Sequence, residues 1–366
     1  MAQTVIDMRK LLTFAVEQQA SDVLITAGAP PMVRINGELI ATKGEPLDPE
    51  TSKKTVYSIL TDDQIARFEE KRELDFSLYL KGLEQRFRGN AFLQRGCVGA
   101  AFRLIPERIP TREELELPPV IEEFCNYHQG LIIVTGPTGH GKSTTQACMI
   151  DIINQRRRAH IITIEDPIEY VHHNRNSIIE QREVGEDTHS FASALRHVLR
   201  QDPNVILIGE MRDLETMSAA LTAAETGHLV ITTLHTNDAV QSVDRLLDAF
   251  PPHQQGQVRT QLAFCLLAVI AQRLVPRSDG KGRIVAVEIL RNIPAVAHLI
   301  REGKTHNIYT VMETHQREGM CTMDAALKKL YLRGLISREE ARTRMRNPEQ
   351  LSRGALGPEA EETRKR

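Results

Sequence analysis

The stretch "GPTGHGKSTT", residues 136–145, places three glycines, one lysine and several hydroxyls close together. It matches the pattern G-x-x-x-x-G-K-[ST], directly after the apolar run "LIIVTG" and before a stretch of helical character. Glycines let successive backbone N–H groups point inward around phosphate oxygens, and the start of the following helix adds positive potential. The sequence therefore predicts a phosphate-binding loop formed by Gly136, Pro137, Thr138, Gly139, His140, Gly141, Lys142, Ser143 and Thr144.

Two residues of this loop carry the chemistry that phosphate binding requires. Lys142 is expected to reach the β- and γ-phosphates of ATP, and the Ser143 hydroxyl is expected to ligate Mg²⁺. The alternative, a flexible surface loop, does not account for the apolar run before it and the helical stretch after it. We therefore expect ATP and Mg²⁺ as the ligands of this segment.

Polar residues end each of four apolar runs: "LIIVTG", "HIITIED", "NVILIGE" and "HLVITTLH". Apolar runs without alternation are typical of strands buried on both faces, as in a parallel sheet covered by helices. Glu210 ends the third run, where it can meet Mg²⁺ or the attacking water, and Glu165 ends the second run. One of these carboxylates is expected to orient or deprotonate the water. The alternative for Glu210 is a solvated carboxylate at a strand end, and the alternative for Glu165 is an acid pair with Asp166 at the start of a helix.

Histidines and arginines complete the candidate site. His228 and His235 bracket the fourth run, which favours a site role over that of core histidines. Phosphoryl transfer often uses a cation supplied by another domain or subunit. Candidates are Arg86 and Arg88, which share one face in "RFR", together with Arg103. A solvated strand face is the alternative for these arginines.

The chain of 366 residues is long enough for roughly two domains. Residues 1–105 combine a helical stripe with strand-like runs and a hairpin signal at Asn36-Gly37, which indicates a small α+β unit. The charged, proline-bounded stretch 106–118 is the expected linker. The remainder is predicted to form a phosphate-loop domain over 119–290, a helical subdomain over 291–346 and a disordered polar tail over 347–366.

The composition is that of an ordinary soluble protein, with 41% hydrophobic and 26% charged residues and a net charge of -2. Near-neutral charge and 4% aromatic residues argue against direct nucleic-acid binding, and therefore against a nucleic-acid translocase. Five scattered cysteines argue against a disulfide framework or a zinc site and indicate a reducing compartment. The start lacks a signal-peptide core, and the apolar run 262–271 is about half a membrane span, so we expect a buried helix there and a cytoplasmic protein.

Four stretches occur in a characteristic order: "GPTGHGKSTT", "TIEDPIEY", "RQDPNVILIGEMRDLETM" and "AETGHLVITTLHTNDA". They resemble the Walker A loop, the acidic box, the Walker B segment and the His box of the secretion-type ring ATPases. The segments "SDVLITAGAPPMVRINGEL" and "RFRGNAF" extend the resemblance over nearly the whole chain. Within these ATPases, the sequence is most similar to the PilT family of type IV pilus retraction ATPases.

The resemblance implies an α/β protein with a PAS-like N-terminal domain, a RecA-like P-loop ATPase domain and a helical C-terminal extension. It also implies a homohexamer with ATP at the seams between neighbours. The implied partner is an inner-membrane pilus platform protein (PilC-like), contacted from the cytoplasmic face, and a paralogous retraction ATPase is a further one. The resemblance assigns the acidic box to Glu165, Walker B to Glu210, the His box to His228 and His235, and the pocket-feeding cations to Arg86, Arg88 and Arg103.

The implied function is a motor that hydrolyses ATP to power pilus retraction and twitching motility. Two features depart from the family pattern. His140 stands where serine is common, and in "AVAHLIREGK", residues 295–304, Ala297 and His298 replace an arginine and an asparagine. Two alternatives therefore stay open: an accessory PilU-like retraction ATPase, and a low-turnover nucleotide-binding partner in a pilus motor.

Overall fold

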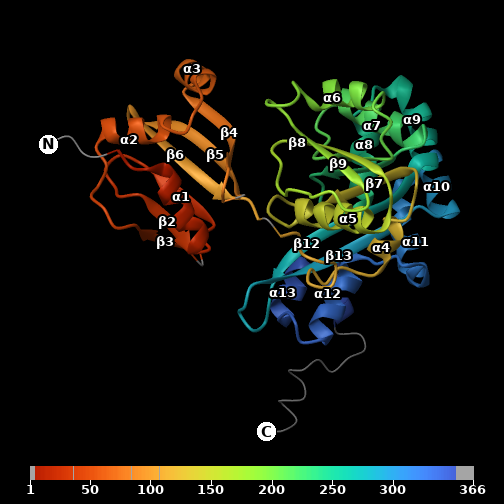
Figure 1. Cartoon of the computed structure of the whole chain (residues 1–366). Coiled ribbons are helices and arrows are strands. Elements are labelled where there is room, and N and C mark those ends of the chain that lie inside the picture. Colours follow the sequence, from red (N-terminus) through yellow and green to blue (C-terminus); the bar gives the residue numbers. More distant parts are fainter. Residues whose placement is uncertain (1–4, 36, 84, 107, 352–366) are drawn as a thin grey trace, which may run out of the picture. The chain divides into compact units, whose positions relative to one another are not determined.

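The computed structural model describes residues 5–35, 37–83, 85–106 and 108–351. The chain divides into two compact units, Met1–Arg108 with Glu169–Val171 and Ile109–Ile168 with His172–Arg366 (Figure 1). Each unit contains its own β-sheet, and helices accompany both. The predicted α/β fold class is confirmed.

Antiparallel pairs join all the strands of the N-terminal sheet, in the order β3-β2-β1-β6-β5-β4. The predicted hairpin is present as β2 paired with β3, although Asn36 itself lies outside the described residues. The elements are α1 (Met8–Glu17), β1 (Asp22–Ile25), β2 (Met32–Ile35), β3 (Glu38–Ala41), α2 (Pro49–Tyr57), α3 (Asp62–Lys71), β4 (Glu73–Leu80), β5 (Gln85–Gln94) and β6 (Cys97–Leu104).

The two faces of this sheet differ in character. On β5, Phe87 and Ala91 are buried in a core that also contains Leu12 of α1 and Val56 of α2. Arg86 and Arg88 occupy the alternate positions of the strand and therefore lie on the opposite face. The face away from this core thus carries the arginines that the sequence analysis selected.

The second unit contains a sheet in the order β13-β12-β7-β11-β10-β8-β9, and all its strands run parallel except β13. The four strands predicted from apolar runs, β7, β8, β10 and β11, are all present and parallel. The strands are β7 (Gly130–Thr135), β8 (His160–Glu165), β9 (Ile178–Glu183), β10 (Val205–Ile208), β11 (Leu229–Leu234), β12 (Leu266–Pro276) and β13 (Arg283–Arg291).

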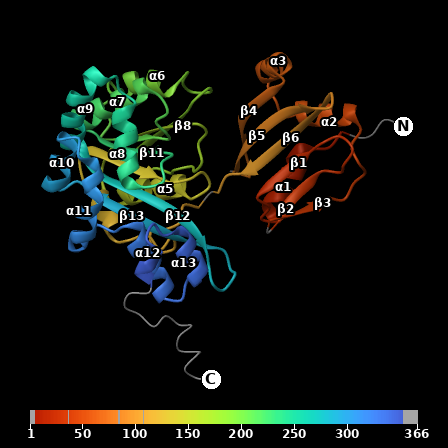
Figure 2. The ribbon, with the colours of Figure 1, turned by 180° about the vertical axis from the view of Figure 1, so that it is seen from behind.

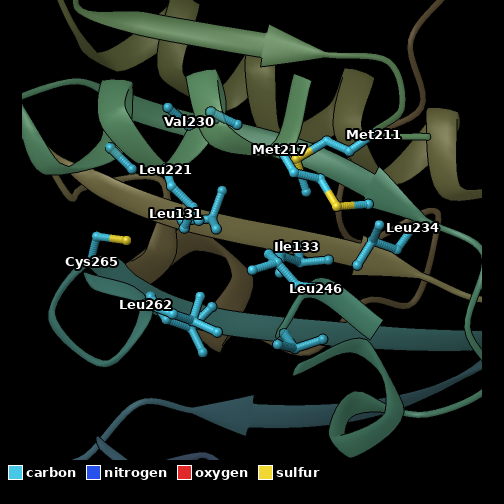
Figure 3. Close-up of a cluster of buried hydrophobic side chains, with 14 of the residues drawn as sticks. Leu131, Ile133, Met211, Met217, Leu221, Val230, Leu234, Leu246, Leu262 and Cys265 are labelled. Atoms are coloured by element: carbon cyan, nitrogen blue, oxygen red, sulfur yellow. The ribbon is translucent and has the colours of Figure 1, made fainter. Parts of the chain in front are cut away.

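Helices cover both faces of this sheet. Leu131 and Ile133 of β7 pack in one cluster with Leu221, Leu246 and Leu262 from α7, α8 and α9 (Figure 3). Figure 2 shows these three helices close to one another in the second unit, where α9 contacts both α7 and α8. The helices of this unit are α4 (Val120–Phe124), α5 (Lys142–Arg156), α6 (Phe191–Val198), α7 (Leu214–Glu225), α8 (Ala239–Asp248), α9 (Pro252–Cys265), α10 (Pro294–Arg301), α11 (Ile308–Thr314), α12 (Met323–Leu332) and α13 (Arg338–Arg344).

The other face of β7 packs against different helices. Ile132 and Val134 share a cluster with Phe124 of α4 and Ile150 of α5. Because both faces are covered, β7 and β11 are buried along their whole length, and their side chains are largely apolar, with two threonines inside β11.

Two predictions about local structure are wrong. The apolar run 262–271, expected to be one buried helix, is divided between the end of α9 and the start of β12, which pairs with β7. Its length and apolarity are equally compatible with a buried helix and a buried strand. Part of the tail expected to be disordered, Pro348–Leu351, forms a 3₁₀ helix with Leu351 buried, whereas residues 352–366 lie outside the described residues.

Among the helices that the structure describes, none combines the length and apolar character that crossing a membrane requires. The cysteines all lie in the described part of the chain, and they are free thiols.

Candidate active site

The predicted phosphate loop connects β7 to α5 at the carboxyl edge of the parallel sheet. Gly136, Gly139 and Gly141 have φ angles of 141°, 76° and 82°, which L side chains rarely adopt. At Gly136 the space is closed as well, because a β-carbon would lie 2.3 Å from the Gln272 carbonyl oxygen. Local backbone geometry and close approach to β12 therefore both require this glycine-rich sequence.

Lys142 lies inside the loop that it follows. Its side chain is nearly buried, and its Nζ donates to the carbonyl oxygens of Gly136 at 2.9 Å and Pro137 at 3.0 Å. Burial lowers the pKa of the ammonium, and the negative charge of Glu210 opposes that shift. The ammonium is thus held where phosphate oxygens can replace the two carbonyls.

The strand order brings two further predicted residues to the same edge. Strands β7, β11 and β10 are neighbours, and His235 and Glu210 follow the carboxyl ends of β11 and β10. The Glu210 carboxylate lies 2.7 Å from Nε of Arg212 and 3.3 Å from Nε2 of His235. These two contacts hold the Glu210 carboxylate in one orientation.

Glu165 ends β8, which pairs with β10. Its Oε1 accepts hydrogen bonds from the Thr163 hydroxyl at 2.6 Å and from Gln181 at 3.2 Å. The residue before Glu210 is Gly209, which lies close to β8. A β-carbon there would approach the Glu165 Cα and the Ile164 carbonyl to 3.3 Å, so an aspartate would crowd β8.

His228 lies at the other end of β11. The pairing runs from Leu229↔Gly130 to Leu234↔Thr135, and the His228 carbonyl accepts from Gly130 N at 3.0 Å, at the amino end of β7. At about 3.3 Å per residue, the strand separates the two histidines by roughly 20 Å. Within one chain the structure therefore brings His235 to the phosphate loop and does not bring His228.

The three predicted arginines lie together on one face of the N-terminal sheet. Arg88 of β5 stands directly opposite Arg103 of β6, and Arg103 in turn stands opposite Asp22 of β1. Asp22 forms ion pairs with Arg103 at 3.0 Å and with Arg34 at 3.2 Å. Arg86 precedes on the same face of β5, opposite Tyr79. Directly opposed like charges are unfavourable, so the pair Arg88 and Arg103 is a candidate for contact with an anion.

Gln272, which no sequence motif indicated, fastens the phosphate loop. Gln272 of β12 is buried and contacts both the phosphate loop and the first turn of α5 through its side-chain amide. The only sequence signal is the pair Gln272-Arg273, which interrupts the apolar run "LLAVIAQRLV".

A second missed residue is Glu288 of β13. Its buried carboxylate accepts from Ala239 N at 2.7 Å and from Met323 N at 2.9 Å, which are the first residues of α8 and α12. Burial raises the pKa of this carboxyl, and the two N–H donors oppose the shift. Glu288 therefore fixes the start of α8, the helix that follows the His235 loop.

A cavity of about 160 Å³ adjoins the phosphate loop on the side of α5. Gly141, Thr144 and Thr145 border it, together with Arg283 of β13. The segment Glu114–Leu117 forms another wall. The cavity therefore continues the phosphate loop with mixed polar and apolar walls, as a nucleoside requires.

The oxygen donors at this edge suit Mg²⁺ bound together with a nucleotide. Within the described ranges, no group of three or more histidine, cysteine or acidic side chains is arranged to hold a metal alone. Mg²⁺ in nucleotide sites uses one or two protein oxygens, completed by phosphates and waters. The Ser143 hydroxyl in the first turn of α5 and the Glu210 carboxylate are such oxygens, so the residues fit the metal.

Known proteins with similar sequences are secretion and pilus ATPases. A family model described as "Type II/IV secretion system protein" matches residues 116–348. The type IV pilus retraction ATPase PilT of Pseudomonas aeruginosa is 47% identical over 94% of this chain and 99% of its own length. The type IV pilus ATPase PilU of the same organism is 45% identical over 92% of this chain and 87% of its own length.

A solved structure gives the same result. The crystal structure of the pilus retraction motor PilT with bound ADP matches with a TM-score of 0.89 at 49% identity, covering 95% of this chain and all of that one. The resemblance inferred from the four sequence motifs is confirmed.

Proposed function

The chain belongs to the type II/IV secretion system protein family, and from this membership we propose that it is an ATP hydrolase that powers the retraction of type IV pili. One observation carries the proposal: a glycine-rich phosphate loop encloses Lys142, with carboxylates on neighbouring strands of the same sheet edge. Binding and hydrolysis of a nucleoside triphosphate are the chemistry that this arrangement supports best.

In the proposed reaction, loop N–H groups and Lys142 hold the terminal phosphates while a water attacks the γ-phosphorus. The bond from that phosphorus to the bridging oxygen breaks, and a carboxylate accepts the water's proton. Glu210, held by Arg212 and His235, and Glu165, held by Thr163 and Gln181, are both candidates for this role. A bound Mg²⁺ would neutralise phosphate charge, with Ser143 and Glu210 as its protein oxygens.

The nucleoside of ATP is proposed to occupy the cavity beside α5. The cavity adjoins Thr144 and Thr145 at the end of the loop, so it lies where the nucleoside would extend from the phosphates. Arg283 also lines this cavity, with Ile284 and Val285 of the same strand.

The proposal includes assembly as a homohexamer at the cytoplasmic face of the inner membrane, acting on a pilus platform protein. In that ring, Arg86, Arg88 and Arg103 serve the bound nucleotide as cations. The supporting observation is their common face, where Asp22 is shared between Arg103 and Arg34. His228 is proposed to act away from its own chain's phosphate loop.

An accessory retraction motor is the second candidate. It is favoured by Ala297 and His298 on α10, which depart from the family motif, and His298 is exposed. Identities of 47% to PilT and 45% to PilU do not separate the two roles.

Steady-state phosphate release by wild type and Glu210→Gln tests the enzymatic part of the proposal. Equal, slow release by both proteins would instead support a low-turnover partner. Deleting the gene and scoring surface pili and twitching tests the biological part. Excess pili without movement support a main retraction motor, whereas missing pili would contradict retraction.

A further inference from the structure

Gln272 contacts the phosphate loop from both ends. Its Nε2 donates to the His140 carbonyl at 2.6 Å, and its Oε1 accepts from the Thr145 hydroxyl at 2.8 Å. Its own carbonyl oxygen fills the space beside Gly136, where a β-carbon would lie at 2.3 Å. Gln272 thus lies against the loop at its beginning, near its middle and at its end, through Gly136, His140 and Thr145.

His140 adds a bond in the same direction. Its Nδ1 accepts from the backbone N–H of Leu274, two residues beyond Gln272 on β12, at 3.0 Å. A ring nitrogen that accepts from a backbone N–H carries no proton, so the bond requires neutral imidazole. A serine hydroxyl, common at this position in the family, is shorter than the imidazole ring, so this bond follows from the histidine of this chain.

These contacts link the loop to a strand rather than to another loop. Strand β12 pairs with β7 and β13 on its two sides, so the sheet fixes its position. Gln272 is 1% exposed, and its amide would lose both partners if the loop moved away. Leaving a buried amide without partners is costly, so the contacts favour one loop conformation.

We propose that Gln272 and His140 are positioning residues that latch the phosphate loop to β12 and preorganise it for nucleotide phosphates. This inference rests on the proposed function, because it concerns the same site. Neither side chain needs to touch the nucleotide, since both act through the loop backbone. Loss of the latch leaves the loop free to adopt several conformations, and binding must then select one of them.

The test uses the purified full chain with ADP as the probe in calorimetric titrations. Gln272→Leu and His140→Leu are expected to weaken ADP binding by roughly tenfold each. His140→Asn keeps an acceptor near the position of Nδ1 and is expected to bind ADP several-fold more tightly than His140→Leu. The matched control is Gln155→Leu, the same change at an exposed residue near the far end of α5, which is expected to bind like wild type.

Hydrogen exchange of the amides of residues 136–145 without nucleotide gives an independent readout. A broken latch is expected to speed exchange by roughly tenfold in Gln272→Leu. Unchanged exchange in this variant, or equal ADP affinities for His140→Asn and His140→Leu, would overturn the latch. If wild type binds no ADP, the proposed function fails, and the exchange measurement still decides the latch. If Gln272→Leu does not fold, the two His140 variants decide it.

Discussion

The carboxyl edge of the seven-stranded sheet and the arginine face of the six-stranded sheet both collect charged side chains, but they satisfy them differently. At the first, Lys142 is bonded to loop carbonyls and Glu210 to His235 and Arg212. At the second, Asp22 serves two arginines while Arg88 stands opposite Arg103. At the edge, each of these charged groups lies within bonding distance of a partner, whereas on the arginine face two arginines stand directly opposite each other.

The two regions are therefore expected to respond differently to a bound anion. At the phosphate loop an incoming phosphate exchanges with existing hydrogen bonds, so the site is preorganised. On the arginine face an anion would relieve repulsion between like charges. We therefore expect substitutions in the phosphate loop to abolish ATP turnover and substitutions of the arginines to reduce it only in part.

The largest effect is expected for Lys142→Ala. Removing the ammonium leaves the phosphates without the cation inside the loop, and ATP turnover should fall at least about 1,000-fold. Phosphate release is the measurement, with the exposed residue change Lys304→Ala as the control. Turnover within tenfold of wild type would show that the loop is not the catalytic centre.

Glu210→Gln is expected to lower turnover by about 100-fold or more, because an amide cannot accept the water's proton. ADP affinity should change much less, since the loop and Lys142 remain. Glu165→Gln, assayed in parallel, decides which carboxylate is the base, and the exposed Glu186→Gln is the control. Normal turnover in both Glu210→Gln and Glu165→Gln would contradict a carboxylate base at this edge.

Arg88→Ala is expected to lower turnover by about 10- to 100-fold, the contribution of one charge-assisted contact. Arg34→Ala makes the same change at the other end of the row, where Asp22 already compensates the arginine, and should cost less than threefold. Turnover should be measured with the assembled protein. Equal losses in the two variants would remove the distinction between the ends of the row.

The sequence predicted the phosphate loop and its strand–loop–helix context because this local geometry demands particular residues. Two features require glycine at position 136: its φ angle, and the Gln272 carbonyl oxygen that fills the place of a β-carbon. The motif indicates the first of these and not the second. Gln272 itself could not be predicted, because it lies more than 120 residues away along the chain and becomes a neighbour only through pairing of β12 with β7.

The two histidines show a different limit. His228 and His235 are seven residues apart in a motif that treats them as a pair, yet the strand predicted between them places them at opposite edges of the sheet. The prediction of one helix for the run 262–271 is wrong because buried helices and buried strands are both uniformly apolar. Pairing of β12 with β7, which local patterns do not encode, decides the structure of that run.

The smallest effect is expected from the titration of His140. Burial first, and then the positive charges of Arg283 on β13, Lys142 on α5, Arg273 on β12 and Arg344 on α13, lower the pKa of this imidazole. A histidine with a lowered native pKa stabilises the fold above its ordinary value of about 6.5, and this contribution is lost as the pH falls through and below that value. The melting temperature of wild type should therefore fall more between pH 8 and pH 5.5 than that of His140→Asn, by on the order of 1 °C because the ring is partly exposed. If the melting temperatures of the two proteins changed identically with pH, protonation of His140 would not weaken its bond to Leu274 N. The phosphate loop would then accept an added positive charge without loss of stability.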